Sequence, residues 1–459
     1  MLARGIVKEE SAHLKRKLET RVNAGFSFSS QTCIMAENRL AKKSRTHNFS
    51  GMKKSLSFAC FALILAGWVQ LAWASDWPAW RGKLGDGTIH DKKAPVAWKL
   101  PDNLVWKTPI PGKGHASPII VGNRIYQITA IEEKAERLLL CIDRATGKEL
   151  WRKVVLKSPL ERVHRLNSRA SSTPTSDGER IYLSFLDKRK MFVAAYDLDG
   201  KKLWEVRPGV FSSIHGYCSS PVLWKDKVIV NGDHDGPGYL VALDKKTGKT
   251  LWKKDRPNNT RSYCTPLIRT IGGRNQMILA GSKCVASYDP DTGKQHWISD
   301  GPTEQYVASL VYNGDLLFMT CGFPKRFMQG IRPDGTGNVT KTHVAWEITK
   351  GCSYVPSPVA IGPYFIVVAD NGVASCLVAK TGERLWMERL KGGHSASLLT
   401  GNGLVYFLSD HGVMTVVKPG PKFKVVAENV VGEDTFATPA FSDGRLYLRG
   451  VKHLFCIDG

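Results

Sequence analysis

The chain has 459 residues, of which 42% are hydrophobic and 23% charged, and its formal net charge is +24 at pH 7. A charge of that size predicts attraction to anionic polymers, although lysines placed in surface turns for solubility would give the same value. The ten cysteines contain no Cys-x-x-Cys pair and no spacing typical of a disulfide-stapled fold. The composition therefore argues against a small disulfide-rich framework.

Residues 52–74 have the three parts of a secretory signal peptide. Met52-Lys53-Lys54 supply positive charge, an apolar run extends from Leu56 to Leu71, and Ala72-Trp73-Ala74 is a small-x-small cleavage site. A transmembrane anchor is the alternative, but the apolar run is short for one. We therefore expect an exported protein, periplasmic or secreted, with no transmembrane span in the mature chain.

The upstream residues 1–51 are polar, basic and without a periodic pattern. A signal peptide that begins at Met52 indicates that 1–51 is a mis-called extension, and a genuine disordered leader is the alternative. Cys60 lies too early in the apolar run to carry a lipid. Without residues 1–74 the net charge is about +16, and for an exported chain this favours envelope polymers over nucleic acid as partners. Residues 75–100 form a leader ahead of the repeats.

One phrase recurs through residues 101–459: an aliphatic strand, Asp, a Thr-Gly-Lys turn and Trp. Its first copy, from Leu139 to Trp151, returns around Asp244 and Asp289, with a shorter turn after Asp197. The tryptophans that end the copies or match that place are Trp106, Trp151, Trp204, Trp252, Trp297, Trp346 and Trp386. Such a regular period indicates one structural unit copied many times.

A second phrase, Ser or Thr followed by Pro and apolar residues, runs in step with the first. It occurs at Ser117-Pro118, Thr173-Pro174, Ser220-Pro221, Thr265-Pro266, Ser357-Pro358 and Thr438-Pro439, with degenerate copies at Ser309-Leu310 and Ser397-Leu398. The tryptophans mark seven units, and residues 422–426 fill the eighth place without a Trp. The chain therefore holds eight units.

Each unit contains about four short β-rich runs, which in the third unit are 221–224, 228–231, 239–243 and 250–253. Four strands in roughly 40–50 residues are typical of a β-propeller blade. The chain ends in a copy cut off before its Trp, and Leu104–Lys107 is the missing strand. We predict an all-β, eight-bladed propeller whose ring is closed by this N-terminal strand joining the last blade.

The repeated residues suit structural roles. Asp can bond its own downstream backbone, Gly accepts positive φ in a tight turn, and Trp packs between neighbouring blades. Cys141, Cys376 and Cys456 occupy equivalent repeat positions and are expected to be buried core thiols. Cys218 and Cys264 precede adjacent Ser/Thr-Pro strands, so a bridge between them is an open alternative.

A propeller's natural site is the mouth of its central channel. If the Ser/Thr-Pro phrase opens the innermost strands, the residues just before it face that mouth. The candidate ligand-binding residues are His115, Arg165, Arg169, His215, Tyr217, Arg261, Tyr263, Tyr306, Tyr354 and His394. Such a ring could hold an anionic or sugar-like ligand, although loops on one rim are also polar simply because they meet water.

The repeat resembles that of the pyrroloquinoline-quinone-type (PQQ-like) propeller superfamily, and Trp77–Gly82 with Asp86-Gly87 resembles the leader of its secreted bacterial members. The resemblance implies the propeller fold. The superfamily includes quinoprotein dehydrogenases and cofactor-free scaffolds such as the outer-membrane assembly lipoprotein. The dehydrogenases hold their quinone against a vicinal Cys-Cys disulfide and also carry a set of calcium-binding side chains. This sequence has no Cys-Cys pair.

We therefore expect a monomeric, cofactor-free exported propeller that binds an envelope protein or anionic polysaccharide through its channel-mouth face. A PQQ-dependent oxidoreductase with calcium and an atypical site is the first alternative. Another channel-mouth enzyme that depends on His115, His215 or His394 is the second. The cluster Asp233-His234-Asp235 could bind a metal but is expected to be a β-turn between outer strands.

Overall fold

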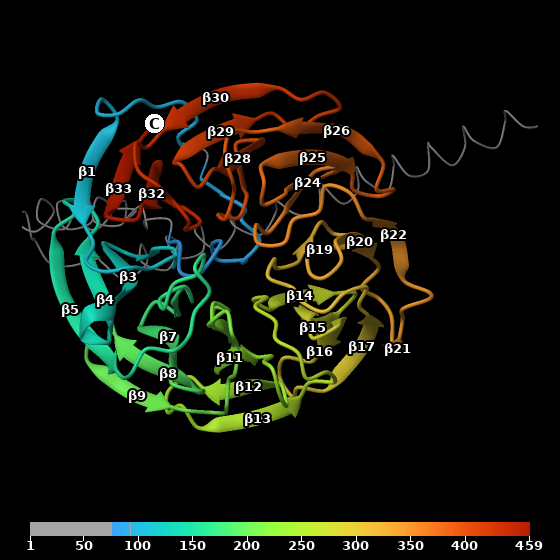
Figure 1. Ribbon diagram of the computed structural model, residues 1–459, viewed down its shortest axis with the longest axis horizontal. Helices are drawn as coiled ribbons and strands as arrows, with labels where there is room; N and C mark the ends of the chain where they lie inside the picture. The colour runs from blue at the N-terminus through green and yellow to red at the C-terminus, as the bar shows by residue number, and fades with distance from the viewer. Residues whose placement is uncertain (1–75, 92) are drawn as a thin grey trace, which may run out of the picture. The chain divides into compact units, whose positions relative to one another are not determined.

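The computed structural model describes residues 76–91 and 93–459, so the predicted extension 1–51 and signal peptide 52–74 lie outside the described residues. Eight sheets follow one another in chain order around a central axis and form a ring (Figure 1). Seven of them have four strands and one has five. The predicted eight-bladed β-propeller is confirmed.

The first four blades run from the innermost strand to the outermost. They are β2 (Ile119–Val121), β3 (Arg124–Ile131), β4 (Glu136–Asp143) and β5 (Glu149–Lys157); β6 (Thr175–Ser176), β7 (Arg180–Asp187), β8 (Lys190–Asp197) and β9 (Lys202–Val206); β10 (Val222–Trp224), β11 (Lys227–Gly232), β12 (Tyr239–Asp244) and β13 (Thr250–Asp255); and β14 (Leu267–Ile271), β15 (Arg274–Gly281), β16 (Cys284–Tyr288) and β17 (Gln295–Asp300). The third blade matches the four runs predicted from the sequence to within two residues at each end.

The last four blades keep the same order. They are β18 (Val311–Tyr312), β19 (Leu317–Cys321), β20 (Phe327–Ile331) and β22 (Val344–Ile348); β23 (Val359–Ile361), β24 (Tyr364–Val368), β25 (Val373–Val378) and β26 (Arg384–Arg389); β27 (Leu399–Gly401), β28 (Leu404–Leu408), β29 (Val413–Val417) and β30 (Val425–Val430); and β31 (Ala440–Ser442), β32 (Arg445–Arg449), β33 (His453–Asp458) and β1 (Leu104–Pro109). The strand β21 (Gly337–Asn338) adds a short parallel edge to β17 of the fourth blade. One 3-10 turn, η1 (Glu132–Lys134), interrupts the described strands.

The eighth blade is built from both ends of the described chain. Its outer strand β1 pairs antiparallel with β33, with Lys107 opposite Phe455 and Pro109 opposite His453. β1 contains Leu104–Lys107, the segment that the sequence analysis assigned as the missing strand of the last blade. Pairing β1 there covers an edge of β33 that would otherwise present unpaired backbone groups.

The recurring geometry of the repeat comes from a tight turn and from a contact between adjacent blades. In the first blade, Asp143 Oδ1 accepts hydrogen bonds from Thr146 N at 2.8 Å and Thr146 Oγ1 at 2.7 Å, which closes the turn. Gly147 follows at φ 72°, and a Cβ there would lie 2.6 Å from the Trp106 ring of the preceding blade. Trp106 Nε1 also donates to Arg144 O at 3.1 Å. Trp204, Trp252, Trp346 and Trp386 donate to the turn of the next blade in the same way, whereas Trp297 bonds Gln276 of its own blade.

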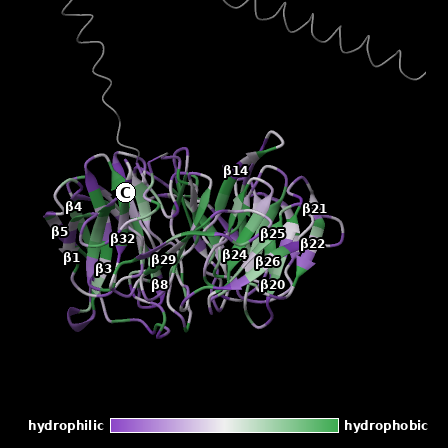
Figure 2. Ribbon diagram, turned by 90° about the horizontal axis from the view of Figure 1, so that it is seen from above, coloured by the Kyte–Doolittle hydropathy of each residue, from purple (hydrophilic) through white to green (hydrophobic). Residues whose placement is uncertain are grey.

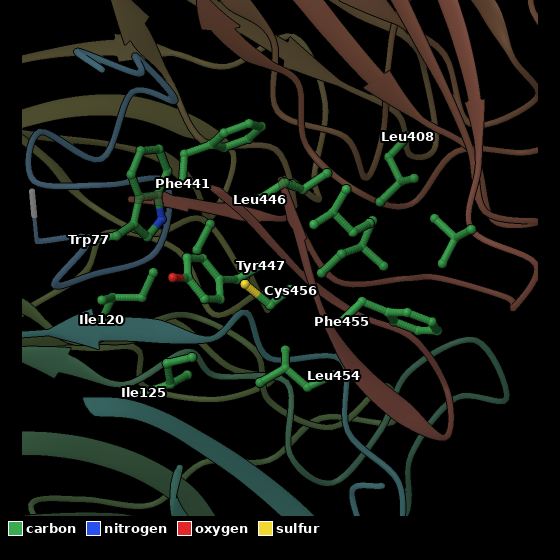
Figure 3. Packing of buried hydrophobic residues seen from close by; sticks show 14 of the residues in the cluster. Trp77, Ile120, Ile125, Leu408, Phe441, Leu446, Tyr447, Leu454, Phe455 and Cys456 are labelled. Atoms are coloured by element: carbon green, nitrogen blue, oxygen red, sulfur yellow. The ribbon is translucent and has the colours of Figure 1, made fainter. Parts of the chain in front are cut away.

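Apolar side chains fill the space between blades. Where the eighth blade meets the first, Trp77 and Ile120 pack beside Phe441 and Tyr447 (Figure 3). The strands carry most of the hydrophobic residues and the loops at both ends of the ring are more polar (Figure 2). Cys141, Cys376 and Cys456 are fully buried, which confirms that they are core thiols.

The leader crosses the ring at the ends of the inner strands and reaches its centre (Figure 1). Trp77 forms a backbone bridge with Ile120 of the first blade, and Pro78 O accepts from Ser176 N of the second at 2.8 Å. The Asp86 carboxylate pairs with Arg269 of the fourth blade at 2.8 Å.

Arg81 is the part of the leader that lies deepest, with no exposed surface. Its guanidinium donates to Pro358 O at 2.6 Å and Leu398 O at 3.2 Å, which belong to the sixth and seventh blades. The backbone of Gly87 and Ile89 then bonds Thr400 of the seventh blade. The leader is therefore a fixed part of the propeller that ties distant blades together.

Candidate functional site

A cavity of about 580 Å³ opens at the channel mouth. Its walls are the loops that lead from each outer strand to the next inner strand, together with hairpin loops between the two middle strands of several blades. All eight blades and the leader residue Trp80 contribute lining residues. A cavity of this size is typical of small-molecule sites.

The repeated Ser/Thr residues form a hydrogen-bonded ring around the channel. Seven of the eight hydroxyl oxygens accept the backbone N–H of the equivalent residue in the preceding blade, and the eighth, Ser117 Oγ, has no partner among the described residues. The seven bonds run from Ser117 N to Thr173, Thr173 N to Ser220, Ser220 N to Thr265, Thr265 N to Ser309, Ser309 N to Ser357, Ser357 N to Ser397 and Ser397 N to Thr438, at 2.9–3.0 Å. The Ser/Thr residues of this phrase therefore join neighbouring blades around the channel.

Six of the candidate residues line the cavity. They are His115, His215, Arg261, Tyr263, Tyr354 and His394. They come together because each lies in a loop that enters an inner strand, and those loops converge on one mouth. The structure therefore places these six residues on the channel face.

The other four candidates do not line it. Arg165 is exposed, and Arg169 turns to Glu132 at 2.5 Å and to Glu161 O at 3.1 Å. Tyr217 packs edge-on against Phe211, and Tyr306 is fully buried in the fourth-blade core. Successive residues of an extended loop point in different directions, so residue type and loop position alone could not separate them.

Several lining residues were missed in the sequence. They include Trp80, His164, Asp370 and Asp410. The two carboxylates lie in the hairpins 369–372 and 409–412, at matching places in the sixth and seventh blades. That repeated Asp-x-Gly pattern was a usable signal, but it has the composition of an ordinary turn.

Burial disfavours the charged form of three histidines that line the cavity, His115, His215 and His394. Desolvation, with Arg449 nearby, lowers the pKa of His115 to about 4, and desolvation lowers the pKa of His394 to about 4. The pKa of His215 is also lowered by burial and by Arg261. Burial raises the pKa of the Asp410 carboxyl. Low polarity therefore suppresses charge on both acids and bases here.

The guanidinium of Arg261, which lines the cavity, already pairs with a carboxylate. Arg261 Nη1 lies 2.7 Å from each carboxylate oxygen of Asp235. No other Lys or Arg belongs to the described lining. The positive charge of the whole chain is thus not concentrated inside the cavity.

The Asp233-His234-Asp235 cluster lies in a loop, as predicted, but this loop joins the two middle strands β11 and β12 rather than outer strands. Asp233 is fully buried and pairs with Arg256 at 2.9 Å, and His234 bonds Pro237 O at 3.1 Å. Within residues 76–91 and 93–459, no group of three or more His, Cys, Asp or Glu side chains could hold a metal ion. The cluster is therefore part of a loop that these bonds hold in place.

Cys218 lines the cavity, but the eight cysteines of the described chain are all free thiols, Cys218 and Cys264 included. Burial raises the pKa of Cys218 to about 12, so its sulfur stays protonated and weakly nucleophilic. The disulfide between Cys218 and Cys264, which the sequence left open, is therefore not formed.

No helix in the described part of the chain has the length and apolar character needed to cross a membrane.

Comparison with known proteins gives two kinds of relative. The sequence model described as "Outer membrane protein assembly factor BamB" matches two overlapping stretches, residues 96–205 and 134–320. BamB of Burkholderia pseudomallei is 24% identical over 286 residues, which cover 61% of this chain and 58% of that protein. The quinohemoprotein alcohol dehydrogenase ADH IIB of Pseudomonas putida is 34% identical over 138 residues, which cover 28% and 19%. The matches span from 19% to 58% of the length of the curated relatives.

Solved structures agree on the architecture. BamB from Moraxella catarrhalis superposes with a TM-score of 0.54 at 14% identity, covering 78% of this chain and 97% of that one. The quinohemoprotein alcohol dehydrogenase from Comamonas testosteroni gives 0.57 at 13% identity, covering 84% and 81%. At such identities the likeness shows the fold alone. Together with the repeat and the family match, it shows that the chain belongs to the PQQ-like β-propeller repeat superfamily.

Proposed function

We propose that this chain is an exported, non-enzymatic binding module that holds a component of the cell envelope at its channel-mouth face. The observation that carries the proposal is the cavity, because loops of all eight blades and the leader converge on a single ligand-sized space. A site assembled from every repeat needs the whole ring. Its loops are anchored on the rigid strands of all eight blades, so the site does not depend on a single loop.

The rim of the cavity supports a docking role. Leu166, Ile214 and Phe323 line it and are 62%, 46% and 51% exposed. Large apolar side chains gathered at a cavity edge are typical of binding surfaces. The similarity to an outer membrane assembly factor points the same way, since that name describes a protein that works in the envelope.

A quinone-dependent oxidoreductase is the second candidate, because dehydrogenases are among the relatives. The donor set does not fit a calcium-quinone group. The described residues offer no metal-binding group of three or more side chains, and the described cysteines form no disulfide against which a quinone could lie. We derive no catalytic step through such a group.

A cavity-filling variant tests the proposal. Val307 lines the cavity, so Val307→Trp should fill it, whereas Val430→Trp places the same side chain on an exposed outer strand. Immobilised full-length protein and both variants would be exposed to a detergent-solubilised envelope extract. We expect a retained component that Val307→Trp loses and Val430→Trp keeps.

Two results would contradict the proposal. Equal retention by both variants would mean that the channel mouth is not the binding face. A saturable change in absorbance with pyrroloquinoline quinone and Ca²⁺, accompanied by alcohol oxidation, would favour the oxidoreductase. Ligand binding at about 100 times the dissociation constant adds roughly 2.7 kcal/mol of stability, so a shift in melting temperature would report it.

A further inference from the structure

The wall of the cavity at the sixth and seventh blades carries polar groups without partners. His394 is 2% exposed, and its Nδ1 has no hydrogen-bond partner among the described residues. The buried Oδ1 of Asp410 also lacks one there. Both residues line the cavity. A buried polar atom without a partner costs about 1–3 kcal/mol, so this wall is stabilised when a ligand supplies the missing bonds.

The backbone holds these two groups on one wall. His394 N donates to Asp370 O at 3.0 Å, and Asp410 N donates to Gly393 O at 2.8 Å. The Asp370 carboxylate in turn accepts from Tyr354 N at 2.9 Å and Val355 N at 3.1 Å. The polar wall is thus fixed by four successive loops and is formed before any ligand arrives.

The hydroxyl ring supplies the complementary groups. The ring members that line the cavity are Thr173, Ser220, Thr265, Ser357, Ser397 and Thr438. Their oxygens accept backbone bonds, and the structure shows no acceptor for their own O–H groups within the described chain. They can therefore donate, whereas the unpartnered Oδ1 of Asp410 can accept. A ligand that satisfies both must itself donate and accept hydrogen bonds.

The charged groups that line the cavity disfavour an anion, and the buried guanidinium of Arg449 near His115 lies outside that lining. Arg261 is engaged by Asp235, and the cavity histidines His115 and His394 are uncharged at neutral pH because burial lowers their pKa to about 4. An anionic ligand would also meet the Asp370 carboxylate. The lining offers aromatic faces instead, from Trp80, Tyr263, Tyr354 and Phe436.

We propose that the channel-mouth cavity binds an uncharged carbohydrate, whose hydroxyl groups bond His394, Asp410 and the hydroxyl ring and whose apolar ring faces lie on the aromatic side chains. This inference rests on the proposed binding function and narrows its ligand. Sugar hydroxyls both donate and accept, and a sugar ring has C–H faces that suit an aromatic surface. An acidic polysaccharide fits the charge of the whole chain but not that of the cavity.

Calorimetric titration tests the inference on the full-length protein. The probes are maltose, cellobiose and N,N′-diacetylchitobiose at millimolar concentration, with digalacturonate as the charged comparison. His394→Phe and Asp410→Leu keep side-chain volume and remove the polar groups. The control is His411→Phe, because His411 is the neighbouring, exposed residue of the same hairpin. We expect an uncharged sugar to bind, each cavity variant to weaken it about tenfold or more, and the control to match the wild type.

The outcomes separate this inference from the proposed function. Tighter binding of digalacturonate than of any uncharged probe would overturn the ligand class and leave the binding module intact. No heat from any sugar, together with envelope capture that Val307→Trp abolishes, would indicate a protein segment as the occupant and overturn the inference alone. Failure of both tests would remove the proposed function as well. Melting curves identify a variant that is merely unfolded, and Asp410→Asn then provides a milder substitution at the same site.

Discussion

The hydroxyl ring gives the sharpest test of what holds the propeller together. Thr173 Oγ1 accepts Ser117 N at 2.9 Å, and both residues are buried. Thr173→Val keeps the shape of the side chain but leaves that N–H without an acceptor. A buried donor without a partner costs about 1–3 kcal/mol, so we expect the free energy of unfolding to fall by about 2 kcal/mol.

Two controls make the prediction specific. Thr173→Ser restores the acceptor and should behave like the wild type, since other members of the ring are serines. Thr415→Val makes the same change at a buried threonine of β29 outside the ring and should cost less than about 0.5 kcal/mol. Urea denaturation measures the stability, and hydrogen exchange follows the Ser117 amide. Equal losses for Thr173→Val and Thr415→Val, or an unchanged Ser117 amide, would refute the role of the ring.

Three further predictions concern buried charge and backbone. Burial lowers the pKa of His115 and His394 from 6.5 to about 4, so between these pH values the unfolded chain binds more protons than the folded one. The free energy of unfolding, measured by urea titration, should therefore be highest above pH 6.5 and fall toward pH 4 by up to about 3 kcal/mol per histidine. His394→Gln should make this decrease smaller. Arg256→Leu leaves the Asp233 carboxyl buried without its cation, and calorimetry should show a loss of about 3–5 kcal/mol that the added change Asp233→Asn largely recovers. Gly112→Ala brings a Cβ to 2.2 Å from Ala130 O at a φ of 69°, and a melting temperature equal to that of the wild type would contradict the expected loss of about 1–3 kcal/mol.

The fold was predictable because its information is local and repeated. Asp143, Thr146 and Gly147 close one turn within five residues, and the same chemistry at Asp244 and Asp289 gives the period. Trp106 adds the contact with the next blade. Since most copies carry turn and contact together, blade count and strand number follow from spacing.

The site was predictable only in part, because its residues are selected by direction rather than by position. His215 and Tyr217 are two residues apart in one loop, yet His215 lines the cavity and Tyr217 packs under Phe211. Asp370 and Asp410 belong to hairpins that the sequence presents as turns, and only the ring geometry brings them beside His394. Loop order identifies the face of the propeller, whereas side-chain direction needs the coordinates.

The leader shows what sequence spacing cannot supply. Arg81 bonds carbonyl groups 277 and 317 residues away, and no repeat pattern relates it to either of them. Those carbonyls belong to Pro358 and Leu398, the residues next to Ser357 and Ser397 of the hydroxyl ring. Arg81 therefore fixes the channel at the level where the cavity ends, and its neighbour Trp80 becomes part of the cavity lining. A segment that precedes the repeats thus helps to set the depth of the cavity, so under the proposed function substitutions in the leader should alter ligand binding even though the blades alone carry the repeat.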